Sequence, residues 1–183
     1  MDKRSIETKK RIENAIIDEW LTGNSPTIKG ITQSLNLNRN TFYLHYANIE
    51  EVTQIILDQY TASIKNKIDT IDIKELFDSP QYLTQILIDE LCNDERIRKL
   101  TLESNISYGY VHDLTNKLVD HVYSRYLNEL NDRGDCYYSV NFLIAGFVHS
   151  LYKLIKQGFD AEKVDILQAE LTALVQFGVS KNR

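Results

Sequence analysis

The chain has 183 residues, of which 43% are hydrophobic and 26% are charged, a composition typical of a globular protein and unlike that of a disordered one. Seven glycines and two prolines provide too few turn signals for a many-stranded sandwich or barrel, and two cysteines cannot form a disulfide framework. The chain begins without an apolar signal core and contains no run of 18 apolar residues. We therefore expect a mostly helical, cytoplasmic protein without a membrane partner.

Charge is distributed unevenly along the chain. Residues 1–47 carry seven Lys or Arg side chains against five Asp or Glu, whereas residues 48–183 carry fourteen against twenty-one. The first segment therefore has a net charge of +2 and the second a net charge of −7. Because local rather than total charge meets the phosphates of a nucleic acid, the mildly basic first segment is compatible with DNA binding.

The first segment of the chain is predicted to contain three helices. Apolar residues spaced three and four apart predict a helix over residues 5–21. Thr27 stands where a side-chain oxygen would cap a short helix over residues 28–35, and Asn36 tolerates the left-handed turn that would follow. Asn38 can then cap another short helix.

Helical periodicity continues through the rest of the chain. Asn48, with Glu51 in capping-box position, predicts a helix that reaches about residue 68. Further helices are expected over residues 80–92, 95–102, 107–130, 136–157 and from 161 to near the end. The segment 136–157 is apolar almost all round, which predicts burial on two sides. The expected fold is all-α, with about nine helices and no strand.

Two short helices joined by a tight turn and preceded by a longer helix form the helix-turn-helix arrangement. In this arrangement the second short helix enters the major groove of DNA, led by its N-terminal residues. Four hydrogen-bonding side chains stand at that end here: Asn38, Arg39, Asn40 and Thr41. Asn and Arg can form paired hydrogen bonds with base edges, and Thr can bind phosphate.

Residues 10–52 resemble the N-terminal module of the TetR family of bacterial transcriptional regulators. The residues that carry the resemblance are Ile12, Ala15, Trp20, the run Thr27-Ile28-Lys29-x-Ile31, and the run Thr41-Phe42-Tyr43-x-His45-Tyr46 followed by Glu50. The resemblance implies a homodimeric repressor whose DNA-binding heads, residues 1–47, grip a palindromic operator. It also implies that the body, residues 48–183, dimerises and binds an unknown small-molecule effector.

Eight residues of the head are expected to contact duplex DNA: Thr27, Lys29, Asn38, Arg39, Asn40, Thr41, Tyr43 and His45. By resemblance, Thr27 and Tyr43 match family positions that hydrogen-bond phosphate, and His45 matches a position near the DNA backbone. Arg39, Asn40 and Thr41 match the start of the recognition helix.

Some positions depart from the family pattern. Asn36 and Asn40 stand where glycine is usual, and Asn40 adds a side chain at the groove. Ile49 replaces a basic residue that is common at this position, and Glu50 and Glu51 beside it repel phosphate. We therefore expect weaker non-specific DNA binding than is typical of the family.

Two aromatic stripes in the body are candidates for an effector pocket. The expected lining residues are Tyr108, His112, Tyr126, Phe142 and His149, which combine apolar walls with a few polar tips. Ordinary helix packing, with the hydroxyl groups bonded to neighbours, is the alternative.

A dimer interface is expected on the last two helices, at Ala145, Gly146, Leu167, Leu171 and Leu174. The helix over residues 136–157 is apolar on more sides than a single chain would bury. The small residues Ala145 and Gly146 would permit close approach of a second copy.

The sequence contains no convincing catalytic or metal-binding pattern. It has no Gly-rich phosphate loop, no nucleophile elbow and no His-Glu-x-x-His run, and His112 and His121 do not share a helix face. We therefore expect no enzyme activity, no metal and no cofactor. Two alternatives to a DNA-binding regulator stay open: a co-regulator whose head binds a protein partner, and a helical protein that binds a small molecule.

Overall fold

The computed structural model describes residues 3–79, 81–104, 106–129 and 137–180, except for the side chains of Phe77, Glu103 and residues 174–180. Within these ranges every regular element is a helix. The elements are α1 (Lys3–Leu21), α2 (Ile28–Ser34), α3 (Arg39–Tyr43), α4 (Ile49–Ile68), α5 (Ile73–Asp78), α6 (Gln81–Leu91), α7 (Glu95–Arg98), the π-helical segment η1 (Lys99–Glu103), α8 (Ser107–Glu129), α9 (Tyr137–Lys156) and α10 (Ala161–Ser180). The predicted all-α fold is confirmed, and α5 is an additional helix.

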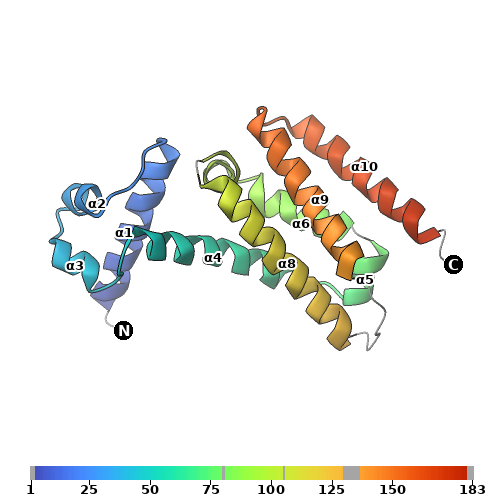
Figure 1. Cartoon of the computed structure of the whole chain (residues 1–183), viewed down its shortest axis with the longest axis horizontal. Coiled ribbons are helices and arrows are strands. Elements are labelled where there is room, and N and C mark those ends of the chain that lie inside the picture. The colour runs from blue at the N-terminus through green and yellow to red at the C-terminus, as the bar shows by residue number, and fades with distance from the viewer. Residues whose placement is uncertain (1–2, 80, 105, 130–136, 181–183) are drawn as a thin grey trace.

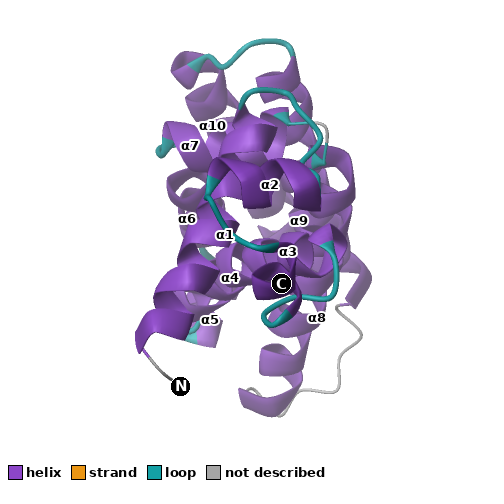
Figure 2. Ribbon diagram, turned by 90° about the vertical axis from the view of Figure 1, so that its left-hand side faces the viewer, coloured by secondary structure: helices purple, strands orange, loops and turns teal. Residues whose placement is uncertain are grey.

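The helices are arranged as a small group and a larger bundle. Figure 1 shows α1, α2 and α3 together at one end of the molecule, and α4 running from them to the bundle that contains α5, α6, α8, α9 and α10. In Figure 2 the small group faces the viewer, with the bundle behind it. We call the small group the head and the bundle the body.

Local capping determines where the helices of the head begin. The side-chain oxygens of Thr27, Asn38 and Asn48 accept hydrogen bonds from backbone N–H groups in the first turns of α2, α3 and α4, at 3.1, 2.9 and 2.7 Å. These N–H groups would otherwise lack partners within their helices. Asn36 has a φ angle of 53°, the left-handed conformation expected of this turn. All four predictions are confirmed.

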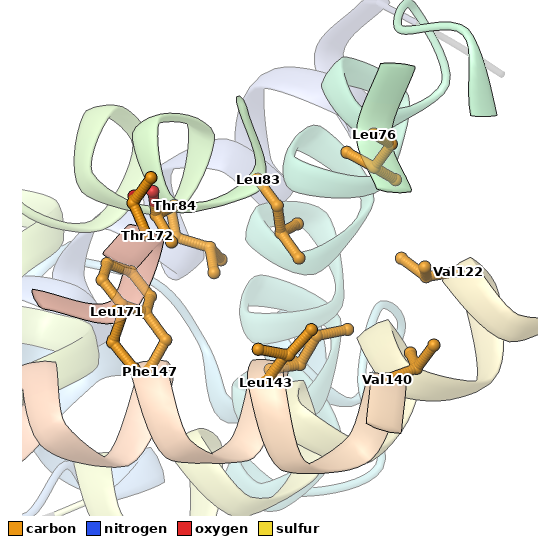
Figure 3. Close-up of a pocket in the computed structure, with 11 residues that line it drawn as sticks. Leu76, Leu83, Thr84, Val122, Val140, Leu143, Phe147, Leu171 and Thr172 are labelled. Atoms are coloured by element: carbon orange, nitrogen blue, oxygen red, sulfur yellow. The ribbon is translucent and has the colours of Figure 1, made fainter. Parts of the chain in front are cut away.

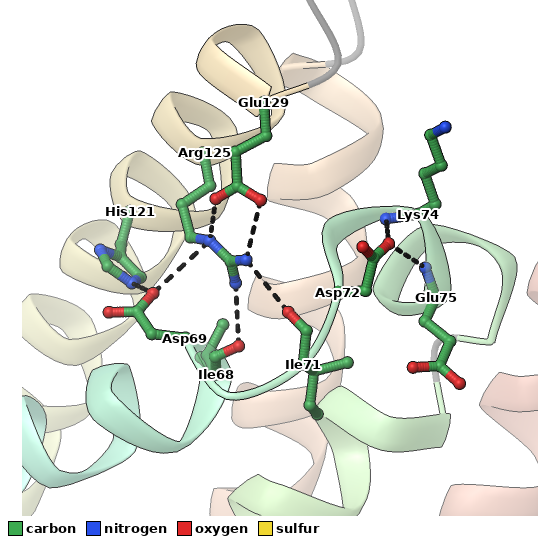
Figure 4. Close-up of polar contacts among 9 residues, drawn as sticks. All are labelled: Ile68, Asp69, Ile71, Asp72, Lys74, Glu75, His121, Arg125 and Glu129. Carbon is green, nitrogen blue, oxygen red and sulfur yellow. Dashed lines mark hydrogen bonds and ion pairs between the residues drawn. The ribbon is translucent and has the colours of Figure 1, made fainter.

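Helix α5 also begins at a capping residue. The carboxylate of Asp72 accepts hydrogen bonds from the backbone N–H groups of Lys74 at 2.8 Å and Glu75 at 3.4 Å (Figure 4). An Asp followed three residues later by Glu is a recognised helix-start signal. The sequence therefore contained the evidence for α5, although the helix was not predicted.

Two hydrophobic clusters correspond to the head and the body. The head cluster consists of Ile12, Ile16, Ile17, Trp20, Ile31, Phe42, Tyr46, Val52, Ile56 and Leu100. Val52 and Ile56 belong to α4 and Leu100 to η1, so the core of the head extends beyond residue 47. The body cluster is formed by residues of α4 to α6, η1 and α8 to α10, together with Cys92.

The C-terminal end of α4 is attached to α8 through Arg125. The Arg125 guanidinium donates hydrogen bonds to the carbonyl oxygens of Ile68 at 2.8 Å and Ile71 at 3.0 Å (Figure 4). Asp69, at the end of α4, lies 2.8 Å from the ring of His121 on α8. Helix α4 therefore starts in the head core and ends at a fixed point in the body.

Helix α9 is buried on one face only, because the other elements of the bundle cover only that side. Six of its residues are buried: Val140, Ile144, Phe147, Val148, Leu151 and Ile155. On the opposite face, Tyr138 is 76% exposed and Phe142 is 73% exposed. A single chain therefore buries one side of this helix, and the predicted burial on two sides would require a second copy.

Candidate nucleic-acid interface

The head has the geometry of a helix-turn-helix arrangement. Helices α2 and α3 are separated by residues 35–38; α2 packs against the longer α1, and Phe42 of α3 shares a hydrophobic cluster with the buried residues of α1. The hydroxyl of Tyr46, just after α3, donates a hydrogen bond of 2.7 Å to the carboxylate of Glu13 on α1. Burial, together with this bond to Glu13, raises the pKa of Tyr46 far above its usual value, so the phenol stays protonated as a donor. The orientation of α3 is thus fixed by the core of the head.

Two aromatic residues define the inner side of α3. Phe42 is fully buried, and Tyr46, one turn later, is 2% exposed. Successive residues of an α-helix are rotated by about 100°, so the intervening residues point elsewhere. Tyr43 is 56% exposed, and its ring packs edge-on against Phe42 with 5.9 Å between centroids. Tyr43 is therefore a surface residue and not a core aromatic.

The eight residues predicted to bind DNA lie on α2, α3 and the positions next to these helices. Six of them are exposed: Thr27, Lys29, Asn38, Arg39, Asn40 and Tyr43. Thr41 and His45 are half-buried. The structure thus brings the eight positions into one region of the head. Leu44, which the sequence analysis did not select, is also exposed on α3's outer side.

Two of these residues combine a structural role with free donor capacity. The caps of α2 and α3 use only the acceptor oxygens of Thr27 and Asn38. The hydroxyl hydrogen of Thr27 and the amide hydrogens of Asn38 are not used by these caps. Hydroxyl and amide donors at the start of a helix are suited to phosphate oxygens and base edges.

Basic residues of α1 contribute to the same region. The guanidinium of Arg11 donates a hydrogen bond of 3.1 Å to the carbonyl of Leu35, at the end of α2. The ammonium group of Lys9 lies 5.4 Å from the centroid of the Tyr46 ring. Both side chains therefore attach α1 to the helix pair and also increase the positive charge near it.

A second candidate site is a cavity of about 50 Å³ in the body. Its lining residues come from α5, α6, α8, α9 and α10 and are Leu76, Leu83, Thr84, Leu87, Val122, Val140, Leu143, Ile144, Phe147, Leu171 and Thr172 (Figure 3). None of them is charged, and only Thr84 and Thr172 carry polar side chains. The cavity is therefore suited to an apolar group.

The five residues predicted for an effector pocket do not line this cavity. Tyr108, His112, Phe142 and His149 are exposed on α8 and α9, and Tyr126 is half-buried on α8. Helical periodicity places residues on a common face, but it does not say whether that face points into the protein. An effector site at these five positions stays a prediction.

Aromatic rings and imidazoles gather on the outer sides of α8 and α9. The ring of Tyr152 on α9 lies 6.5 Å from that of Tyr108 on α8 and 6.2 Å from that of His149. Tyr138 and Phe142 continue the stripe along α9. We call this surface, formed by Tyr108, His112, Tyr138, Phe142, His149 and Tyr152, the aromatic face.

The residues predicted for the dimer interface are divided between surface and core. Ala145 and Gly146 are half-buried on α9. Leu167 and Leu171 pack against the body cluster, and Leu171 also lines the cavity. The side chain of Leu174 lies outside the described residues. Two of the four described positions are thus engaged within the chain itself.

Other kinds of site have little support. Burial raises the pKa of the Cys92 thiol to about 12, so the reactive thiolate is disfavoured. Among the described residues, no group of three His, Cys, Asp or Glu side chains could hold a metal ion. No helix in the described ranges is long and apolar enough to cross a bilayer.

Comparison with known proteins agrees with the arrangement of the head. No family model matches the chain. A stretch of 67 residues, 35% of the chain, is 36% identical to the uncharacterized HTH-type transcriptional regulator YxbF of Bacillus subtilis (strain 168). This stretch covers 18% of that relative's length. The chain is thus an all-α protein with a helix-turn-helix head and partial similarity to a transcriptional regulator, whereas membership of the TetR family stays a prediction.

Proposed function

We propose that the protein is a sequence-specific, DNA-binding transcriptional regulator that reads duplex DNA with α3. The observation that carries the proposal is the orientation of α3, with Phe42 in the head core and Arg39, Asn40 and Tyr43 exposed. The partial identity to an HTH-type regulator supports the same function. A residue pattern of this kind can combine phosphate binding with base readout.

We further propose that two copies bind a palindromic operator as a repressor. The aromatic face supports association, because Tyr108, Tyr138 and Phe142 are each more than two-thirds exposed in one chain. Contact with a second copy would remove these rings from water. The two α3 helices would then have to lie one helical turn of DNA apart, about 34–36 Å, or a multiple of that distance.

A small-molecule effector that changes operator affinity completes the proposal. An engineered apolar cavity of about 150 Å³ binds benzene, and the cavity in the body has roughly a third of that volume. Binding of such a ligand would therefore separate the helices around the cavity. Displacement of α4, which joins body and head, would then change the spacing of the two recognition helices.

The proposal is tested by selecting a binding site from a random duplex library and titrating the selected duplex at several salt concentrations. We expect a palindromic site that binds two chains. Arg39→Ala should weaken binding and, if Arg39 contacts phosphate, reduce the salt slope by about one per head. Lys74→Ala, which changes an exposed basic residue of α5 in the body, is the matched control and should bind like the wild type.

Failure of the wild-type protein to enrich any duplex would contradict the proposal.

The alternative of a head that binds a protein partner is favoured by the apolar Ile49 and the acidic Glu50 and Glu51 at the start of α4. Glu51 is engaged locally, since its carboxylate accepts a hydrogen bond from the backbone N–H of Ala47. Glu50 and Glu51 both place negative charge at this edge.

A further inference from the structure

Leu44 is the most exposed large hydrophobic residue in the described part of the chain, at 81%. It follows α3 directly and has helical backbone angles, with φ −68° and ψ −19°. Its backbone N–H donates to the carbonyl oxygen of Asn40 at 3.0 Å, as in a regular helical turn. The direction of the Leu44 side chain therefore follows from helix geometry.

That direction is away from the head core. Phe42 and Tyr46 mark the core side, and Leu44 is two residues from each, a rotation of about 200° from both. Asn40, one turn earlier, lies on the same outer side as Leu44. Figure 1 shows α3 in the part of the head remote from the bundle of the body.

The surroundings of Leu44 indicate which kind of binding partner would cover its side chain. Its exposed neighbours Arg39, Asn40 and Tyr43 all carry hydrogen-bonding groups suited to DNA. A leucine among them offers no hydrogen bond and gains free energy only by leaving water. In the major groove, the C5-methyl group of thymine is the apolar feature available at a base edge.

We infer that Leu44 reads thymine by packing against its C5-methyl group, at one position in each half of the operator. This inference rests on the proposed DNA-binding function, because it assigns a base to the outer side of α3. It adds an apolar contact to the eight polar and aromatic positions expected to bind DNA. The partner is thus a thymine at a fixed distance from the bases read by the start of α3.

The test replaces each thymine of the selected duplex, in both half-sites, by deoxyuridine, which lacks only the methyl group. Wild-type affinity should fall about fourfold per half-site at one symmetric pair of positions, which corresponds to about 0.8 kcal/mol for one buried methyl-sized group. Substitution at the other thymines should have little effect. Leu44→Ala should bind the thymine and deoxyuridine duplexes equally, and Leu44→Met should retain the discrimination.

Ile166→Ala is the matched control, since Ile166 on α10 is also an exposed aliphatic residue, at 51%. It should discriminate between the duplexes as the wild type does. The inference is overturned if no deoxyuridine substitution weakens binding, or if Leu44→Ala discriminates as strongly as the wild type. Either result would leave the DNA-binding function intact and make Leu44 available to a protein partner. Absence of any duplex binding by the wild type would overturn both proposals.

Discussion

At the scale of single residues, the adjacent rings of Phe42 and Tyr43 have different roles, because successive residues of a helix are rotated by about 100°. Phe42 is fully buried and holds α3 against the head core, whereas Tyr43 is 56% exposed. The Tyr43 ring still contacts Phe42 by its edge. Its position on the surface is therefore defined, and its hydroxyl can be directed to a phosphate.

Tyr43→Phe should weaken binding to all duplex sequences about equally. The substitution keeps the ring contact and removes one hydrogen bond to a charged acceptor, which contributes about 1.5–3 kcal/mol. We expect a loss of about tenfold or more in affinity, measured on the selected site and on unrelated duplexes. Tyr82→Phe on α6, where the ring is 39% exposed, is the control. A loss confined to one operator base would contradict a phosphate contact.

At the scale of elements, α3 is only five residues long and depends on its cap. The Asn38 oxygen accepts the N–H of Asn40 at 2.9 Å. Such a short helix has little intrinsic stability, so the cap and the burial of Phe42 hold it in place.

Asn38→Ala and Asn38→Asp separate the structural role of this residue from its proposed role in binding. Alanine removes the cap and should lower the free energy of unfolding by about 1 kcal/mol in urea titrations. Aspartate keeps an acceptor at the helix start and should leave stability nearly unchanged. Its negative charge should nevertheless weaken DNA binding. Wild-type affinity of Asn38→Asp would show that Asn38 lies outside the interface.

Helices α4 and α6 are linked by an ion pair with a defined pH dependence. Glu90 on α6 lies 2.5 Å from the ammonium group of Lys67 and accepts a 2.7 Å hydrogen bond from Ser63, both on α4. Burial alone would raise the pKa of Glu90, but the bonds from Lys67 and Ser63 outweigh it and lower the pKa below its usual value. The Glu90 carboxylate therefore stabilises the fold when it is ionised.

Glu90→Gln should reduce the free energy of unfolding at pH 7 by about 1 kcal/mol or less. Because the folded pKa is lowered, the contribution of Glu90 is complete above the usual carboxyl pKa of about 4.3 and is lost as pH falls through the lowered value. The difference between variant and wild type should therefore disappear in denaturant titrations at more acidic pH. Glu7→Gln, at an exposed position of α1, should show no such convergence.

At the scale of the whole molecule, α4, η1 and α7 connect the head to the body. Helix α4 contributes to both hydrophobic clusters, and so does η1, with Leu100 in the head cluster and Leu102 in the body cluster. Arg96 on α7 adds an ion pair of 3.0 Å to Asp18 on α1. Movement in the body can therefore reach the head through any of these three elements.

Association through the aromatic face is tested by Phe142→Glu. Phe142 is 73% exposed, so the substitution should leave the helical content and stability of one chain unchanged. In a dimer it would place a charge in the interface and remove two phenyl rings, and we expect the dissociation constant to rise by about a hundredfold or more. Analytical ultracentrifugation measures this change, with Ile166→Glu on α10 as the control. A wild-type monomer, or an unaffected dimer of Phe142→Glu, would exclude this interface.

Features that depend on local interactions could be predicted from the amino-acid sequence. The caps at Thr27, Asn38 and Asn48 and the left-handed turn at Asn36 need only residues a few positions away, because they satisfy backbone groups within one turn. Amphipathic periodicity likewise located the first helix of the head, and the caps located the two short helices that follow it.

Which apolar faces are covered depends on how the helices pack and could not be predicted in this way. Tyr108 and Phe142 have the helical spacing of a pocket wall, yet both are exposed, whereas Leu171 lines a cavity built by five helices. The exposure of Leu44 likewise follows from the packing of Phe42 and Tyr46 in the head core. Burial depends on contacts with residues that are distant along the chain. The hydrophobic pattern of a single helix does not show which of those residues pack against it.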